Sequence, residues 1–241
     1  MDAFTKEELL KGLLVGYRKR GHRDADDQPR RAVTQDDLAR FLGIWRRWYG
    51  QLESGKRVPK VEELEQIAHF LEMTPRARTA LFRRALSCDP MPWPTYGDAG
   101  AAPTLWQASM DAHPTCLTDA GFTILRHNDR FASRFPYAVV GDEGSTPNLI
   151  RLLVLRPEAR EHLSAWGQWA ELLTAELAEA LALHRENQEL QRLHREVSED
   201  QAAGPVYARA ATYLFPDDEC KAALIEAPSV AGARQLTLID I

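Results

Sequence analysis

The chain has 241 residues, of which 44% are hydrophobic and 27% are charged, and its formal net charge is −5. This length suffices to bury two small cores or one large one, and no apolar run approaches the ~20 residues of a membrane-spanning helix. The start, MDAFTKEELLKG, is acidic where a secretory signal is basic. We therefore expect a cytoplasmic protein with no membrane partner.

The charge is distributed unevenly along the chain. Residues 1–86 contain 18 Lys or Arg against 13 Asp or Glu, a balance of +5, whereas residues 87–241 contain 12 against 22, a balance of −10. A basic N-terminal part followed by an acidic part is typical of a DNA-binding domain attached to a body that avoids phosphate.

The sequence lacks the motifs of several kinds of catalytic, metal-binding and cofactor-binding site. Three cysteines, Cys88, Cys116 and Cys220, lie far apart without a CxxC motif, which predicts neither a disulfide framework nor a zinc site. The sequence has no HExxH, no GxSxG, no phosphate-binding loop and no dinucleotide fingerprint. We expect no catalytic residues, no metal site and no cofactor, so an enzyme is the least favoured class.

Five helices are predicted within residues 1–86. They are expected to begin after polar capping residues, which for three of them are Thr5 with Glu8, Thr34 with Asp37, and Thr74 with Pro75. The first helix has an apolar face at helical spacing, made by Leu9, Leu10, Leu13, Leu14 and Tyr17. The fourth helix, residues 61–71, carries Leu64, Ile67, Ala68 and Leu71 inward.

Residues 34–55, TQDDLARFLGIWRRWYGQLESG, have the spacing of a helix-turn-helix. Ala39 is small where the next helix crosses, and Gly43 can adopt the left-handed turn at the end of the first helix. An apolar side for the second helix comes from Ile44, Tyr49 and Leu52. In these residues the chain resembles the bacterial and phage repressor family (Cro/C1-type, also called XRE).

That resemblance implies that double-stranded DNA is the partner, with the second helix of the motif in the major groove. Arginine suits a guanine edge and glutamine suits an adenine edge. The positions that the family implies are Arg46, Arg47 and Gln51 for bases, Gln35 for a phosphate, and Lys56, Arg57 and Lys60 for the DNA backbone.

The motif departs from the family in two places. Trp45 stands where the family has a capping Ser or Thr. Two roles are open for Trp45 and Trp48: contact with a DNA sugar or thymine methyl group, or closure of the domain's own core. The loop of residues 21–33 is also longer than usual, and its Arg30 and Arg31 could add contacts to the DNA backbone.

Residues 87–103, SCDPMPWPTYGDAGAAP, form a predicted linker because four prolines and two glycines interrupt any regular period. They separate a DNA-binding domain, residues 1–86, from a second domain, residues 104–241. The second domain begins with a short predicted helix, residues 105–110. A hairpin follows in TCLTDAGFTILRH, residues 115–127, joined at Asp119-Ala120-Gly121.

The remainder of the second domain alternates helical and strand-like segments. A short helix is expected after Asn128, then the box NLIRLLVL, and then a long helical region from Pro157 to about Ser198. Three strand-like runs close the chain: VYARAATYLF (206–215), KAALIEA (221–227) and RQLTLIDI (234–241). The order predicts an α+β fold, in which a five-stranded antiparallel sheet is covered by helices on one face in a PAS-like arrangement.

The strand pair ending at Asn128, the NLIRLL box and the helix containing AREHLSAW resemble the MmyB-like ligand-binding domain. The resemblance implies a bacterial transcription regulator with a PAS-fold pocket for a small apolar, fatty-acid-like molecule. A pocket between sheet and helices would be lined mainly by apolar side chains. The candidates are Phe122, Ile124, Leu149, Leu153, Trp166, Trp169 and Leu173. The alternative is that these residues are plain core, which is the usual role of aromatic stripes at helical spacing.

Together these patterns favour a homodimeric, one-component transcription regulator whose second domain senses a ligand and dimerises. The alternative is a DNA-binding protein whose second domain docks a protein partner and binds no small molecule. An enclosed apolar cavity would favour the sensor, and a filled core with an exposed apolar patch would favour the docking module.

Overall fold

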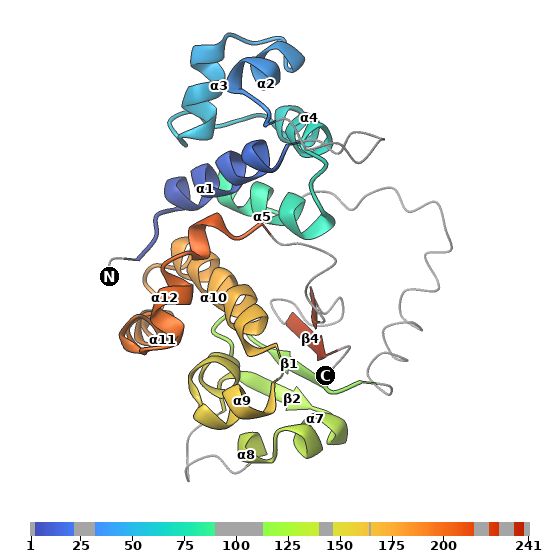
Figure 1. The fold of residues 1–241 in the computed structure, drawn as a ribbon, viewed down its shortest axis with the longest axis vertical. Helices are drawn as coiled ribbons and strands as arrows, with labels where there is room; N and C mark the ends of the chain where they lie inside the picture. The colour runs from blue at the N-terminus through green and yellow to red at the C-terminus, as the bar shows by residue number, and fades with distance from the viewer. Residues whose placement is uncertain are drawn as a thin grey trace.

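The computed structural model describes residues 3–21, 32–89, 113–139, 147–163, 165–214, 222–226 and 234–238. A helical head, residues 3–86, lies at one end of the molecule, and a body of helices and a small sheet, residues 113–238, lies at the other (Figure 1). Arg30, Arg31, most of the predicted linker and the expected helix 105–110 lie outside the described residues.

The head contains the five predicted helices: α1 (Lys6–Arg20), α2 (Gln35–Phe41), α3 (Arg46–Glu53), α4 (Val61–Phe70) and α5 (Pro75–Leu86). Thr5 and Thr34 each form the expected capping box, and the Thr74 hydroxyl accepts a hydrogen bond from the backbone amide of Ala77. These caps satisfy amides that would otherwise lack a partner at the first turn, so the helix starts follow from local chemistry.

The core of the head is the predicted apolar face of α1 packed against the other helices. All five predicted α1 side chains, and the inward residues of α4, are buried. A fully buried leucine contributes on the order of 2 kcal/mol relative to an exposed one, so these side chains are a main source of the head's stability.

Four strands of the body form an antiparallel sheet in the order β2-β1-β4-β3. They are β1 (Thr115–Thr118), β2 (Ile124–His127), β3 (Ala222–Glu226) and β4 (Arg234–Leu238). β1 pairs with β2 on one side and with β4 on the other, where Thr115 stands opposite Thr237. The predicted hairpin and the last two predicted strands are therefore present.

The expected strand 206–215 is wrong, and the described residues contain four strands instead of five. This segment holds the end of α12 (Ala203–Tyr207) and a 3-10 helix, η2 (Ala210–Thr212). The carboxylate of Asp200 accepts hydrogen bonds from the amides of Ala202 and Ala203 and thereby starts the helix. The five-stranded PAS-like sheet is thus not confirmed.

The remaining helices of the body are short except for two. They are α7 (Asp129–Arg134), α8 (Pro136–Val139), the π-helix η1 (Arg151–Leu155), α9 (Pro157–His162), α10 (Trp166–Leu183) and α11 (Gln188–Glu199). The predicted long helical region is therefore three helices. Asn187 starts α11 by accepting hydrogen bonds from the amides of Glu189 and Leu190.

Helix α10 lies at the centre of the molecule and is buried on nearly all sides. It packs against η1, α11 and α12 within the body and against α1 of the head. Within the described ranges, no helix has both the length and the apolar character needed to cross a membrane.

The head and the body share one continuous apolar core. Helix α1 packs on η2, where a side chain on Gly12 would overlap the carbonyl oxygen of Ala211. The hydroxyl of Tyr17 donates a hydrogen bond to the carbonyl oxygen of Leu214 at 2.8 Å. The two predicted domains are therefore docked against each other.

Opposite charges meet at the same interface. The guanidinium of Arg84 on α5 lies 3.2 Å from the carboxylate of Glu179 on α10, with side chains only 1% and 4% exposed. Arg84 also donates to the carbonyl oxygen of Leu9, and Arg76 lies 3.6 Å from Glu176. Some of the basic residues of the head and acidic residues of the body thus pair with each other across this interface.

Candidate functional site

A glycine with left-handed backbone angles lies on each side of helix α3, Gly43 before it and Gly55 after it. At Gly43 the backbone φ is +65°, and the amide of Ile44 donates to the carbonyl oxygen of Ala39, which closes α2 as predicted. At Gly55 φ is +72°, and the amide of Lys56 donates to the carbonyl oxygen of Gln51. Because a left-handed turn costs glycine little, both ends of α3 are defined by local sequence.

The inner face of α3 is buried and carries a charge. Tyr49 and Leu52 are fully buried, and Glu53 is 4% exposed. The Glu53 carboxylate accepts two hydrogen bonds from the guanidinium of Arg18 on α1, at 2.6 and 3.0 Å. It accepts a third from the side-chain amide (Nε2) of Gln35 on α2, at 2.9 Å. A buried carboxylate needs such partners, so this network holds α3 in a fixed orientation against α1 and α2.

The network affects both partners of Glu53. Burial lowers the pKa of Arg18, but hydrogen bonds and charge from Glu53 raise it by more, so its pKa is raised overall. Gln35, which was expected to contact a DNA phosphate, is half-buried, and its side-chain amide donates a hydrogen bond to the Glu53 carboxylate. Glu53 was not among the residues predicted from the sequence, because its position beside Tyr49 and Leu52 does not reveal its distant partner Arg18.

The outer face of α3 is open to solvent. Trp45 is 79% exposed, Trp48 is 49% exposed, and Arg46 and Arg47 are also exposed. The interpretation that the two tryptophans close the core of the head is therefore wrong. Arg46 lies 3.6 Å from Asp36, and a pair this long and exposed is weak, so its guanidinium can exchange partners.

The other predicted contact residues differ in availability. Lys56 and Lys60 are exposed, and Gln51 is partly buried. Arg57 donates a hydrogen bond to Glu63 at 2.8 Å, and its guanidinium lies over the Trp48 ring, 4.8 Å from the centroid. These lysines can approach phosphates directly, whereas Arg57 is held in place by its neighbours.

The first group of predicted ligand-contact residues lies around the hairpin. Ile124 is a buried residue of β2, but Phe122, expected on the same strand, precedes it in the turn with a φ of +64°. The amide of Leu149 donates to the carbonyl oxygen of Phe122 at 2.8 Å. The hairpin and the segment before η1 are therefore directly joined.

The second group lies where η1 packs against α10. Leu153, Trp169 and Leu173 are buried, and the partly buried Trp166 donates from its indole nitrogen to the carbonyl oxygen of Leu153 at 3.1 Å. A π-helix leaves its carbonyls irregularly placed, and it is a frequent feature of functional sites. The segment 148–155 connects this group with the first.

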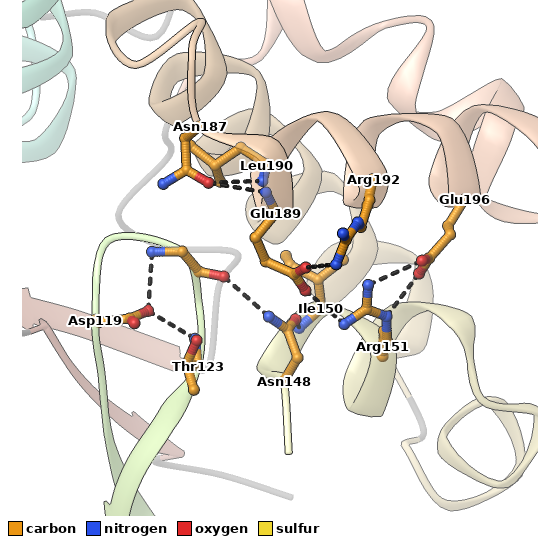
Figure 2. Close-up of polar contacts among 11 residues, drawn as sticks. Asp119, Thr123, Asn148, Ile150, Arg151, Asn187, Glu189, Leu190, Arg192 and Glu196 are labelled. Atoms are coloured by element: carbon orange, nitrogen blue, oxygen red, sulfur yellow. Dashed lines mark hydrogen bonds and ion pairs between the residues drawn. The ribbon is translucent and has the colours of Figure 1, made fainter. Parts of the chain in front are cut away.

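A polar cluster that was not predicted from the sequence supports residues 148–155 (Figure 2). The Asn148 amide donates to the carbonyl oxygen of Gly121 and accepts from the amide of Ile150. Arg151 donates two hydrogen bonds to Glu196 and one to Glu189, and these raise its pKa. Two polar residues inside the apolar box were the available signal, and they fasten the hairpin and α11 to η1.

The described residues offer little for metal or thiol chemistry. They contain no group of three or more His, Cys, Asp or Glu side chains placed to hold a metal ion. Cys116 is buried on β1, which raises the pKa of its thiol, whereas Cys88 is exposed. Cys220 lies outside the described residues.

Comparison with protein families gives two matches. Residues 23–82, which include α2, α3 and α4, match the helix-turn-helix domain family. Residues 106–225, which include the hairpin, η1 and α10, match the MmyB-like transcription regulator ligand-binding domain family. No curated protein matches the chain. The chain therefore belongs to the helix-turn-helix transcription regulators that carry an MmyB-like ligand-binding domain.

Proposed function

We propose that the chain binds operator DNA through α3 and regulates transcription. One observation carries this proposal: α3 is fixed by buried Glu53 on its inner face and exposes Arg46 and Arg47 on its outer face. Helices α2 and α3 lie at the end of the molecule remote from the body (Figure 1). A DNA duplex can therefore approach α3 without meeting the acidic body.

In this proposal Arg46, Arg47 and Gln51 read base edges, and Lys56 and Lys60 contact phosphates. Arginine pairs with guanine through two parallel hydrogen bonds, whereas lysine adds charge attraction without sequence preference. Gln35 contributes by orienting α3 through Glu53, and Arg57 by supporting Trp48. The roles of these last two residues thus change from direct DNA contact to support of the contact surface.

The test begins with selection of a preferred sequence from a random duplex library. Replacing Arg46 or Arg47 by alanine should cost about 1–3 kcal/mol at the selected site and relax base preference. Lys56→Ala, the matched control, should weaken binding to all sequences similarly. Arginine variants that keep full affinity and base preference would contradict the assignment.

We also propose that the body binds a small apolar ligand with fatty-acid-like character. The matched family is described as ligand-binding, and the apolar candidates come from two adjoining places, the hairpin and the η1–α10 contact. A ligand changes DNA affinity only if it favours one arrangement of head and body, and the operator must then change ligand affinity by the same factor.

Mass spectrometry of small molecules retained through native purification tests this proposal first. Operator binding is then titrated with dodecanoate, and with dodecanol as the control that lacks a carboxylate. Leu153→Trp should block the site and abolish the response while basal operator binding stays unchanged. If no small molecule is retained and neither probe changes operator affinity, docking of a protein partner is the better account of the body.

A single α3 reads only a few base pairs, so we propose that two chains bind half-sites about one helical turn apart. The helical region from Pro157 to Ser198 has the apolar surface from which we expected the dimer interface, but the apolar side chains of its longest helix, α10, pack inside the chain. Sedimentation at micromolar concentration, with and without operator DNA, tests the assembly. A stable monomer under both conditions would refute it.

A further inference from the structure

Exposed apolar side chains concentrate on one part of the head. Among the residues for which the structure describes side-chain exposure, six large hydrophobic side chains are exposed, and five of them fall between residues 41 and 61. These five are Phe41, Trp45, Trp48, Val58 and Val61, and the sixth is on β2. Trp45 is the most exposed at 79%.

The side chain of Trp45 does not cap the helix that it precedes. It is the N-cap of α3, with extended backbone angles and no hydrogen bond from its side chain to the first turn. A serine or threonine at an N-cap stabilises a helix, and a buried tryptophan would stabilise the core. Trp45 does neither, so its large apolar side chain is suited to a contact outside the chain.

Trp48, one turn later, is held differently. The Arg57 guanidinium lies over its ring, and Arg57 is in turn bonded to Glu63. Trp48 is therefore half-exposed and supported by the head itself, while Trp45 stands free beside Arg46 and Arg47. The pair supplies a matched comparison of two exposed indoles, one at the N-cap of α3 and one in its first turn.

The charges around Trp45 indicate the kind of partner. Arg40, Arg46, Arg47, Lys56 and Lys60 are exposed on α2, on α3 and in the loop that follows α3. This excess of positive charge complements the phosphates of DNA. On base edges in the major groove, the apolar group available to an indole is the C5-methyl of thymine.

We propose that Trp45 contacts a thymine methyl group in the major groove and selects thymine at that position of each half-site. This proposal rests on the proposed operator binding through α3. It names a specificity-determining residue at the N-cap of α3. The arginines beside it would read the neighbouring base pairs.

Deoxyuridine substitution isolates this contact because it removes only the methyl group. Each thymine of the selected operator is replaced in turn, and affinity is measured for the wild-type chain, Trp45→Ala and Trp48→Ala. We expect one position per half-site at which the wild-type chain loses about four-fold in affinity, the effect of one buried methyl group. Trp45→Ala should show no loss there, whereas Trp48→Ala should keep it.

The outcomes separate the two proposals. Wild-type binding that is blind to every methyl group, or a Trp45→Ala chain that keeps the same sensitivity, overturns the thymine contact alone. A uniform loss of affinity in Trp45→Ala with methyl sensitivity intact points to a sugar contact and also overturns it. A wild-type chain that selects no operator overturns the proposed function. Thermal unfolding of both variants checks that the exposed indoles are dispensable for folding.

Discussion

Replacing Glu179 by glutamine removes a negative charge from the centre of the contact between head and body. The Glu179 carboxylate lies 3.2 Å from the Arg84 guanidinium, and water barely reaches either side chain. In Glu179→Gln the guanidinium of Arg84 keeps the carbonyl oxygen of Leu9 but loses the negative charge of Glu179. We expect this substitution to destabilise the docked arrangement more than any exposed charge change.

The size of the effect follows from the geometry. At an effective dielectric constant of about 20, unit charges separated by the distance of such a contact attract by about 4–5 kcal/mol. Dehydration of both groups offsets much of this attraction in the native pair, but Glu179→Gln leaves the buried guanidinium of Arg84 without the charge of Glu179. The expected cost of Glu179→Gln is therefore about 3–5 kcal/mol.

Urea unfolding followed by circular dichroism and tryptophan fluorescence measures this cost. A matched control is Arg209→Ala, which breaks the exposed 3.4 Å pair with Glu171 on the same helix α10 and should cost less than about 1 kcal/mol. The double variant Arg84→Met with Glu179→Leu should regain most of the stability, because apolar side chains can fill the same space.

This expectation is refuted if Glu179→Gln costs less than about 1 kcal/mol, or if the costs of Arg84→Met and Glu179→Leu, each measured singly, simply add in the double variant. Either result would mean that the head is held on the body by the apolar core of α1 and η2 alone. In that case the buried pair would have no measurable part in transmitting a ligand signal from α10 to the head.

Further outcomes are expected at other positions. Gly12→Val should weaken the docking of α1 on η2 and lower the melting temperature, because the added side chain meets the carbonyl of Ala211. In the control Gly167→Ala the added methyl group meets nothing within 4 Å, so the melting temperature should stay equal or rise. Gly43→Ala should cost about 1 kcal/mol in urea unfolding, because the left-handed turn strains any other residue. Burial raises the pKa of Asp200, but hydrogen bonds from the start of α12 and an arginine lower it by more, so its pKa falls on folding. Its contribution to stability is thus present above its unfolded pKa of about 3.9 and is lost as pH falls through its lower folded-state pKa, so the gap in melting temperature between wild type and Asp200→Asn should narrow as pH falls below about 3.9. Equal temperature gaps at pH 6 and pH 3 would contradict that sign.

Local sequence by itself determined most of the head. Thr5 and Thr34 start helices because a hydroxyl and an acid three residues later satisfy the first amides, whatever the rest of the chain does. Gly43 ends α2 because its left-handed turn is local as well. The helix-turn-helix was predictable because each of its features depends on residues within about one helical turn.

Tertiary structure alone decided which charges are buried and which aromatic side chains are exposed. Glu53 and Glu179 look like surface acids until Arg18 and Arg84, distant in the sequence, are brought against them. Residues 206–215 alternate like a strand, yet Asp200 and the packing of η2 on α1 make the segment helical. Burial of a charge, the pairing of a strand and the exposure of Trp45 each depend on what the folded chain places beside them, and a local pattern contains no record of those distant neighbours.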